Sequence, residues 1–276
     1  MACLPAAASQ GQLPEKLVVV VVESLSVLKA DDRLEGWRRP FNHLHERYAI
    51  QSGILDWRGA TLRAEVRELC WQSLDGHHIQ SLPAALPAVL KSLQYETCAF
   101  HGFHAGMYER DRLYPLLGFG HSVFLDDMKK SSERPVPVCG TLFHGAKDSF
   151  VASLVRDEIL QPGKRLVYWL TLAGHIPVNI PLARELATPE DQKTFGELPV
   201  EVWAHNVICR SVLQNIADIA AEKSLRNCDF VIVGDHAVPF TSAKLRGFYQ
   251  PNCVPYLILR HIETTPVGSL AAGATP

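Results

Sequence analysis

Residues 229–236 read Asp-Phe-Val-Ile-Val-Gly-Asp-His, the pattern of a buried β-strand that ends in a carboxylate and an imidazole. The apolar run at 230–233 favours a strand, and Gly234 lets the backbone turn after it. Asp235 and His236 then stand at the carboxyl end of the strand, where open α/β sheets bind their ligands. An oxygen and a nitrogen donor side by side form half of a divalent-metal site, although such pairs also serve as turn residues or helix N-caps.

A second strand of the same kind offers a matching half. Residues 17–22, Leu-Val-Val-Val-Val-Val, form a continuous run that is typical of a central parallel strand covered on both faces. Glu23 follows this run directly and repeats the geometry expected for Asp235. The alternative is that Glu23 only caps the following turn.

A helix is predicted at 61–70, where the residues are good helix formers. Three apolar residues share one face of this helix: Leu62, Val66 and Leu69. Glu65 and Glu68 fall in the opening turns, where they suit the helix dipole. Thr61 lies at or near the N-cap, and a hydroxyl there is ordinarily structural. The alternative is that the helix amides and a nearby cation hold a phosphate against Thr61, which becomes its nucleophile.

The composition excludes some classes of protein. The 276 residues are 47% hydrophobic and can bury the core of one large domain or two small ones. A net charge of -2 gives no basic field, so we expect no nucleic-acid partner. The longest apolar run is about a third of the ~20 residues that a membrane helix needs. The N-terminus lacks a signal-peptide pattern, so the chain is either cytosolic or a piece of a longer membrane-anchored or exported protein.

Residues 101–119 are unusual because they hold two histidines, two arginines and two tyrosines between glycines. The segment is too polar for a core and too aromatic for a simple linker. Arginine and aromatic side chains suit a hydroxylated, anionic group with a sugar-like or glycerol body. The alternative is a surface loop that its aromatic residues pin down.

The remaining segments predict the scaffold of one α/β domain. Strands are expected at 97–100, 164–172 and 254–259, and helices at 82–93 and 204–225. Residues 31–48 are interpreted as a surface helix or loop. Strands that alternate with helices predict a mostly parallel central sheet sandwiched by helices. The domain is expected to span 16–262, between a flexible linker at 1–15 and a flexible tail at 263–276.

Other metal-ligating residues fall outside these patterns. Six histidines are expected to be bystanders: His43, His45, His77, His78, His121 and His144. The seven cysteines include no Cys-x-x-Cys pair, and their odd number leaves at least one thiol free if disulfides form.

Five separated pieces of the sequence share an order and a spacing across residues 17–260. They are Val21-Val22-Glu23-Ser24, Gly59-Ala60-Thr61, the segment from His101-Gly102 through Tyr108-x-Arg110-Asp111 to Leu117-Gly118-Phe119, Leu170-Thr171-Leu172-Ala173-Gly174-His175-Ile176-Pro177, and Val233-Gly234-Asp235-His236. Together they resemble the alkaline phosphatase and sulfatase superfamily, in particular its membrane-anchored phosphoglycerol and phosphoethanolamine transferases. The segment from 101 to 119 is similar to that of the lipoteichoic acid synthases.

The resemblance implies that Glu23, Thr61, Asp235 and His236 hold one divalent cation. Three oxygens and one nitrogen suit Mn²⁺, Mg²⁺ or Zn²⁺, and the sequence does not choose among them. Thr61 would attack a phospholipid head-group donor and release diacylglycerol. It would then carry a phosphothreonine ester until a glycan or lipid-glycan acceptor displaces it.

The resemblance also implies roles for residues around the cation. His101 and His175 would hold the phosphoryl oxygens and shuttle the proton, because imidazole titrates near neutral pH. Tyr108 and Arg110 would frame the head group. Relatives work outside the cytoplasmic membrane, so the resemblance implies a periplasmic or extracytoplasmic domain at the membrane surface, cut from a membrane-anchored protein.

Some residues depart from the family's pattern. Ala237 stands where many relatives carry glycine, Tyr108 stands where some carry tryptophan, and Glu109 replaces an amide common in the lipoteichoic acid synthases. A carboxylate there repels a glycerophosphate and attracts an ethanolamine ammonium, so the donor stays open. No Cys-x-Pro-x-Arg sequence is present from which a formylglycine could be made, which argues against a true sulfatase.

Two other functions remain open. A metal-dependent phosphodiesterase or phosphatase would hydrolyse the same bond with water as the acceptor. A non-catalytic relative would bind a glycan or a lipid, but such a protein could lose Thr61 or a cation ligand, and all four residues are present here.

Overall fold

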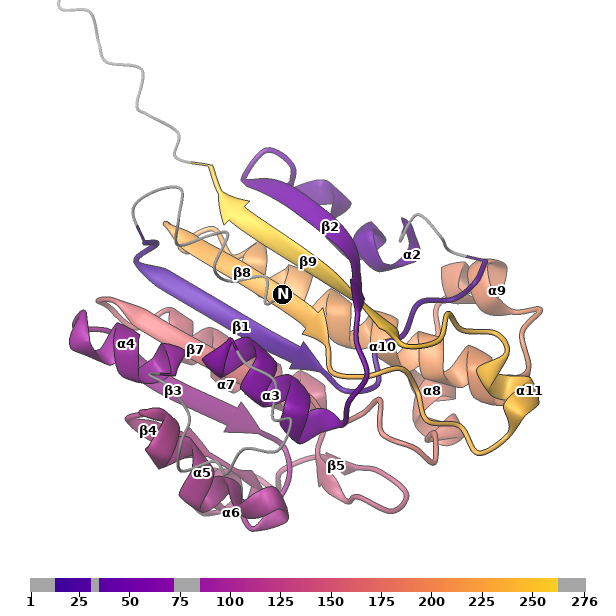
Figure 1. The fold of residues 1–276 in the computed structure, drawn as a ribbon, viewed down its shortest axis with the longest axis horizontal. Coiled ribbons are helices and arrows are strands. Elements are labelled where there is room, and N and C mark those ends of the chain that lie inside the picture. Colours follow the sequence, from indigo (N-terminus) through magenta and orange to yellow (C-terminus); the bar gives the residue numbers. More distant parts are fainter. Residues whose placement is uncertain (1–12, 31–34, 72–84, 263–276) are drawn as a thin grey trace, which may run out of the picture.

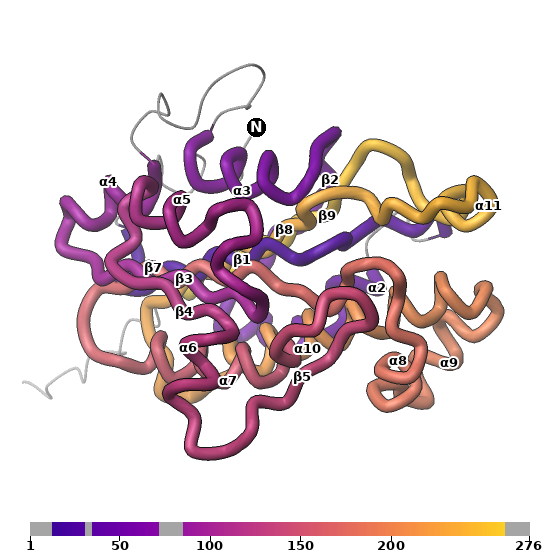
Figure 2. Tube along the Cα trace, turned by 90° about the horizontal axis from the view of Figure 1, so that it is seen from below, coloured from indigo at the N-terminus to yellow at the C-terminus, as the bar shows by residue number. Residues whose placement is uncertain are grey.

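The computed structural model of the chain describes residues 13–30, 35–71 and 85–262. Within them a seven-stranded sheet lies between two layers of helices, as Figures 1 and 2 show. In spatial order the strands are β2 (Tyr48–Asp56), β9 (Cys253–His261), β8 (Cys228–Gly234), β1 (Lys16–Val22), β7 (Arg165–Leu170), β3 (Glu96–His101) and β4 (His121–Val123). The expected α/β class, with helices on both faces of the sheet, is confirmed.

The sheet is parallel from β8 through β1, β7 and β3 to β4. The strand β9 pairs antiparallel with β8 on one side and with β2 on the other. The central strand β1 is buried on both faces, as its run of valines predicts. The strand β2 was not predicted from the sequence, because only its first residue, Tyr48, is buried and Gly53 interrupts its apolar residues.

Each face of the sheet has its own helices. One face is covered by α3 (Thr61–Cys70), α4 (Leu86–Ser92) and α5 (Arg110–Leu117), the last preceded by η3 (Met107–Glu109). The other face is covered by α2 (Glu35–Arg38), η1 (Arg39–Leu44), α6 (Leu125–Ser131), α7 (Asp148–Ile159) and α10 (Val200–Ala220). Successive side chains of β1 alternate between the two cores, so the strand holds both layers together.

The remaining elements gather near the carboxyl ends of the parallel strands (Figure 1). They are the hairpin of β5 (Val138–Cys139) and β6 (Gly145–Ala146), and the short helices α8 (Ile180–Leu186), α9 (Pro189–Phe195) and α11 (Ala243–Arg246). This end of the sheet is where the predicted ligand-binding residues fall.

Two sequence-based interpretations need correction. The segment 31–48 is not all surface, because Trp37 and Phe41 are fully buried under the sheet, although His43 and His45 are exposed as expected. The segment 101–119 is not a loop, because its second half forms α5 and buries apolar residues against β3 and β7. Parts of other predictions lie outside the described residues: most of the linker, the tail at 263–276, the start of the helix at 82–93, and the pair His77 and His78.

Within the described residues, no helix combines the length and the apolar character needed to cross a membrane. The six cysteines of the described residues are free thiols, and all of them are buried.

Candidate active site

The carboxyl ends of β1 and β8 lie side by side and carry the two acidic residues of the site. Glu23 follows β1 and Asp235 follows β8, and the register pairs Val22 with Gly234. The Asp235 amide donates to the Val22 carbonyl at 3.2 Å, so the two acids leave neighbouring strands at the same level. A Cβ on Gly234 would come within 2.5 Å of the Leu25 carbonyl oxygen, which explains the glycine before the acid.

Thr61 joins the acids from α3, which begins at this residue. Its Oγ1 donates to Asp235 Oδ2 at 2.8 Å and lies 3.4 Å from both Glu23 Oε2 and His236 Nε2. The same nitrogen of His236 is 3.2 Å from Asp235 Oδ2 and 3.5 Å from Glu23 Oε1. The structure therefore brings together the four side chains that the family resemblance predicted as cation ligands.

Neighbouring groups fix the orientation of the two carboxylates. Asp235 Oδ1 accepts from the backbone amides of Ser24 at 2.7 Å and His236 at 2.6 Å, which leaves Oδ2 to face α3. Glu23 Oε1 accepts from the Ser24 hydroxyl at 2.9 Å, and the Glu23 amide donates to Thr171 Oγ1 at 2.9 Å. Ser24 adopts a left-handed φ of 55°, and in this turn its amide and its hydroxyl serve one carboxylate each.

The two carboxylates are buried beside each other, which disfavours their charged forms. Burial raises the pKa of Glu23, and the charge of Arg110 opposes this rise. Burial, and after it the charge of Glu23, raises the pKa of Asp235. A divalent cation would offset both the desolvation and the mutual repulsion. The ligand atoms of Glu23, Asp235 and His236 all lie within 4.8 Å of one another, so these residues fit a cation.

The tautomer of His236 suits the same purpose. Its Nδ1 lies 3.1 Å from the Ala237 carbonyl oxygen, which can only accept a hydrogen bond. Nδ1 therefore carries a proton, and Nε2, which faces the two carboxylates, is the nitrogen that would hold a cation. A ring held in this way by a backbone carbonyl is the usual arrangement of a metal-bound histidine.

His101 is the last residue of β3 and lies at the level of Val21 in β1, with β7 between them. Two strand spacings separate these residues, about 10 Å. Its Nδ1 donates to the Leu170 carbonyl at 3.1 Å, and burial lowers its pKa to about 3, so the ring is neutral with a free lone pair on Nε2. This tautomer fits the expected proton shuttle better than hydrogen-bond donation to a phosphoryl oxygen.

His175 lies in the loop that follows β7, and close packing holds this loop against the site. A Cβ on Gly174 would lie 2.1 Å from the Glu23 carbonyl oxygen, so the two backbones touch. The buried carboxylate of Asp148 accepts hydrogen bonds from the amides of residues 172 and 173, at distances between 2.8 and 3.2 Å. The loop is thus fixed from both sides before it reaches the histidine.

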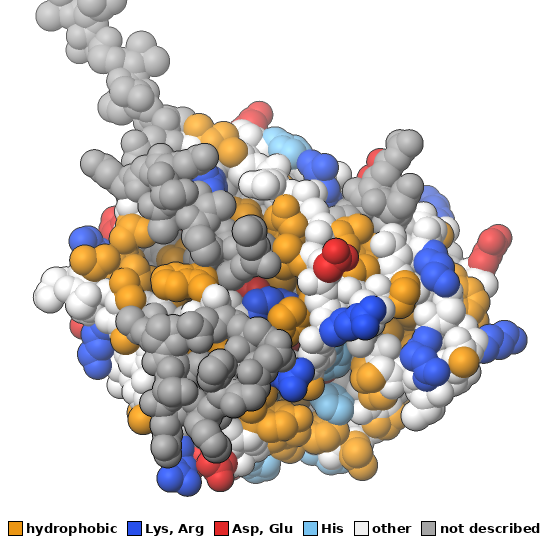
Figure 3. Space-filling view, in the orientation of Figure 1, with side chains coloured by type: hydrophobic (Ala, Val, Ile, Leu, Met, Phe, Trp, Pro, Cys, Tyr) orange, Lys and Arg blue, Asp and Glu red, His pale blue; other side chains and the backbone are white. Residues whose placement is uncertain are grey.

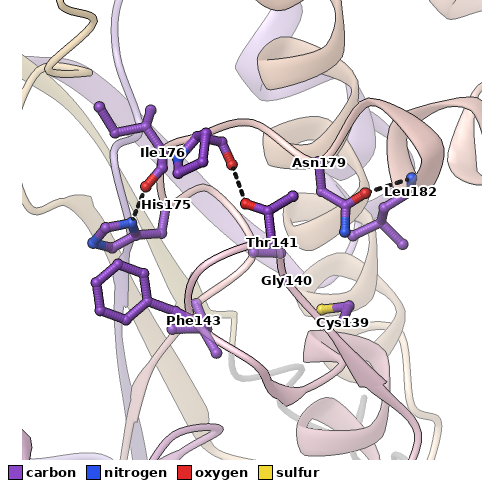
Figure 4. A pocket seen from close by; sticks show the side chains of 11 residues that line it. Cys139, Gly140, Thr141, Phe143, His175, Ile176, Asn179 and Leu182 are labelled. Atoms are coloured by element: carbon purple, nitrogen blue, oxygen red, sulfur yellow. Dashed lines mark hydrogen bonds between the residues drawn. The ribbon is translucent and has the colours of Figure 1, made fainter.

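A small pocket lies beside His175, as Figure 4 shows. The ring of Phe143, from the β5–β6 hairpin, packs at 4.0 Å between ring centroids. The His175 Nδ1 donates to the Ile176 carbonyl at 2.6 Å, and the Thr141 hydroxyl donates to the Pro177 carbonyl at 3.0 Å. The hairpin that supplies these contacts was not predicted from the sequence to take part in the site.

Arg110 occupies a different place from the one predicted. Its side chain is buried, and its Nη2 and Nε donate to Glu65 Oε2 at 2.8 and 3.1 Å. The Tyr114 hydroxyl donates to Glu65 Oε1 at 2.6 Å. The guanidinium therefore binds Glu65 and does not stand free to frame a head group. Tyr108, whose ring lies 5.1 Å from the guanidinium, is 47% exposed and remains accessible.

Two acids in this region differ from their sequence-based interpretation. Glu65 was assigned to the helix dipole, yet it is fully buried and holds Arg110. Its spacing of four residues from Thr61 on one helix face was the signal that could have placed it near the site. Glu109 is exposed and lies 3.5 Å from Arg112, where solvent weakens its charge.

The site reaches the molecular surface on the face shown in Figure 3. Histidine side chains appear there near the carboxyl ends of β1 and β8, close to lysine or arginine side chains. The His236 side chain keeps 15% of its surface exposed, although the two carboxylates behind it are buried.

The chain has the fold of several solved proteins. It is similar to the lipoteichoic acid synthase LtaP from Listeria monocytogenes, with a TM-score of 0.62, 14% identity, and coverage of 89% of this chain and 65% of that one. It is also similar to the Streptococcus pyogenes phosphoglycerol transferase GacH in complex with sn-glycerol-1-phosphate, with a TM-score of 0.61 and 15% identity, covering 92% of this chain and 71% of that one. A third similar structure is the C-terminal periplasmic domain of EcEptC from Escherichia coli in complex with Zn. Its TM-score is 0.59 and its identity 15%, and the match covers 91% of this chain and 74% of that one.

These likenesses show the fold, and the chain spans less than two thirds of the length of LtaP. No curated protein matches the sequence. The model of the family described as Sulfatase matches residues 17–247, which is most of the chain. This match includes Glu23, Thr61, Asp235 and His236, and it confirms the resemblance seen in the sequence. The chain belongs to the sulfatase family.

Proposed function

We propose that the chain is a cation-dependent transferase that moves a phosphoglycerol or phosphoethanolamine head group from a phospholipid to a glycan or lipid-glycan acceptor. One observation carries the proposal: the Thr61 hydroxyl opens a helix and lies 2.8 Å from Asp235 and 3.4 Å from both Glu23 and His236. A hydroxyl activated in this way is a nucleophile for phosphoryl transfer. The catalytic domain is residues 16–262.

Glu23, Thr61, Asp235 and His236 would hold one divalent cation, Mn²⁺, Mg²⁺ or Zn²⁺. Their three oxygens and one nitrogen are donors that all three ions accept. When bound, the cation lowers the pKa of the Thr61 hydroxyl and neutralises charge on the phosphoryl group. The burial of two adjacent carboxylates supports this assignment, because solvent does not compensate their charge.

The first half-reaction uses Thr61 as the nucleophile. Asp235 Oδ2 accepts the hydroxyl proton while Thr61 Oγ1 attacks phosphorus. The bond between phosphorus and the diacylglycerol oxygen breaks, and diacylglycerol leaves with a proton from solvent. Ala60, the N-cap of α3, makes no side-chain capping bond, and the positive end of the helix dipole at Thr61 favours the phosphoryl oxygens.

The second half-reaction transfers the head group from the phosphothreonine ester to the acceptor. An acceptor hydroxyl attacks phosphorus, and its proton passes to the Nε2 of His101 or His175. Both rings donate from Nδ1 to a backbone carbonyl and so present the lone pair of Nε2, although the lowered pKa of His101 makes that ring a weak base. The Thr61 oxygen leaves and regains the proton that Asp235 held.

Tyr108 and Arg110 would act on the head group in different ways. The exposed ring of Tyr108 contacts it directly, whereas the buried Arg110 acts through its charge, which also opposes the rise in the pKa of Glu23 that burial causes. The similarity to a phosphoglycerol transferase that binds sn-glycerol-1-phosphate supports this class of substrate. The similarity to a periplasmic domain supports an extracytoplasmic location, and a phospholipid donor would place the chain at a membrane surface. The net charge of -2 gives no basic field for a nucleic-acid partner.

The test is incubation with Mn²⁺ and fluorescent phosphatidylglycerol or phosphatidylethanolamine, followed by mass spectrometry of the peptide that contains Thr61. We expect a head-group phosphate adduct on Thr61 in the wild type and none in Thr61→Ala. Thr61→Ser keeps a hydroxyl and should retain part of the activity. Full turnover by Thr61→Ala would refute the mechanism.

The same experiment separates the two alternatives. A hydrolase would release glycerol phosphate or phosphoethanolamine in the absence of an acceptor, and an added glycan would not divert the product. A non-catalytic relative would form no adduct and release no diacylglycerol, although the labelled lipid would still bind. The intact set of four ligand residues argues against the non-catalytic relative.

A further inference from the structure

A second group of metal-ligating side chains lies away from the candidate active site. Cys98 belongs to β3, His121 to β4 and Glu158 to α7, and their ligand atoms all lie within 4.8 Å of one another. The register pairs Cys98 with His121, so both side chains leave neighbouring strands at the same level. Cys98 contributes to the core under α7, the face of the sheet opposite to α3 and Thr61.

We propose that Cys98, His121 and Glu158 form a binding site for one borderline-soft divalent cation such as Zn²⁺. A thiolate, an imidazole and a carboxylate are the ligands that Zn²⁺ takes in proteins, whereas Mg²⁺ and Mn²⁺ favour oxygen. Three protein ligands leave a fourth position of the tetrahedron for water. Binding transfers the Cys98 thiol proton to solvent.

The surroundings orient the ligands and give the ion a way in. Arg165 forms an ion pair with Glu158 Oε1, and this leaves Oε2 directed to His121 Nε2 at 4.0 Å. The His121 side chain is 50% exposed and that of Glu158 17%, while Cys98 is fully buried behind them. An ion can therefore enter past the histidine and meet the sulfur at the base of the site.

The site has a structural consequence for the sheet. The strand β4 has three residues and forms the edge of the sheet. A cation held by Cys98, His121 and Glu158 would tie this edge to β3 and to α7. Since the ion binds the folded chain only, it raises the melting temperature by about 5 °C or more at 100 times its dissociation constant.

The probe is Co²⁺, because a bound thiolate gives an intense sulfur-to-cobalt charge-transfer absorption that oxygen and nitrogen ligands do not give. We expect this absorption in the wild type and in Asp235→Asn, which lacks a ligand of the active site. Zn²⁺ should abolish it by displacement. Cys98→Ser should lose it, and Cys253→Ser, a matched change of another buried cysteine, should keep it.

His121→Gln covers the case in which Cys98→Ser does not fold, because its side chain is half exposed. Without metal, we expect His121→Gln and the wild type to have the same melting temperature. The variant should lose Co²⁺ affinity at least tenfold, and Zn²⁺ should not raise its melting temperature. The proposal is overturned if the wild type gives no charge-transfer absorption, if Cys98→Ser retains it, or if His121→Gln binds Co²⁺ as the wild type does.

Discussion

Gly174 and Glu23 touch through their backbones. A Cβ at Gly174 would lie 2.1 Å from the Glu23 carbonyl oxygen, closer than any real Cβ contact. The loop that carries His175 and the turn that carries a cation ligand are therefore in direct contact. A displacement of either segment is transmitted to the other, which makes this glycine a requirement of the site.

Gly174→Ala should damage the site without unfolding the chain. The extra methyl group forces the Glu23 turn away from Asp235, with a loss of stability of about 1–3 kcal/mol and of cation affinity of about 10-fold or more. Calorimetric titration with Mn²⁺ and urea unfolding measure the two effects. Gly106→Ala is the matched control, because a Cβ there meets nothing within 4 Å. Equal behaviour of the two variants would contradict the argument.

The buried pair of Glu65 and Arg110 predicts strong coupling between the two residues. Removing one partner leaves a buried charge without compensation, so Glu65→Gln and Arg110→Met should each cost about 3–5 kcal/mol of unfolding free energy. The double variant Glu65→Gln with Arg110→Met removes both charges and should cost much less than the sum of the two single changes. Urea unfolding of the single and double variants measures this coupling. Additive costs would show that the pair is not a unit.

Asp235 predicts the dependence of the site on a cation. Asp235→Ala removes an oxygen ligand and leaves the Ser24 amide without its acceptor. Mn²⁺ affinity should therefore fall more than about 100-fold, which exceeds the loss caused by changing a residue that only holds a ligand in place. The measurement is titration calorimetry, with Asp126→Asn as a control on an exposed carboxylate that pairs with His104. Unchanged metal content in Asp235→Ala would remove the ligand assignment.

The sequence predicted the parts of the structure that local pattern determines. The valine run of β1 and the apolar run of β8 mark strands that are buried on both faces, and the acid after each strand was placed correctly at the sheet edge. Thr61 was recognised because the run of helix-forming residues indicates where α3 begins. These three features fix the candidate site, since parallel strands end at one edge of the sheet.

The rest depended on contacts between distant segments. Arg110 and Glu65 form a buried ion pair between two helices, and the two residues are 45 positions apart in the sequence. The sequence around either residue does not distinguish an ion pair from a contact with a substrate. Asp148 accepts hydrogen bonds from backbone amides of the loop before His175, 24 residues further along the chain. Backbone amides are common to nearly all residues, so the sequence does not indicate this contact. The pairing of Cys98 with His121 appears only when β3 and β4 are aligned.

Asp148 predicts how stability depends on pH. Its carboxylate is buried and accepts the amides of Leu172 and Ala173, and burial raises its pKa from 3.8 to about 6 although these hydrogen bonds oppose the rise. Between these two values the folded chain holds a proton that the unfolded chain has lost. The stability that this proton contributes is therefore complete below pH 4 and lost as the pH rises through 6, a change of about 3 kcal/mol.

Asp148→Asn removes this titration and keeps one oxygen that can accept both amides. The free energy of unfolding of Asp148→Asn minus that of the wild type should therefore rise by about 2–3 kcal/mol between pH 4 and pH 7. Urea unfolding across this range measures the difference, and Asp157→Asn, on the exposed side of α7, should show no comparable trend. Asp148→Ala separates the charge from the hydrogen bonds, because it leaves two amides unpaired at every pH and should cost about 1–3 kcal/mol for each. A difference between Asp148→Asn and the wild type that stays constant with pH would mean that this carboxyl group has the same pKa in the folded and unfolded chains.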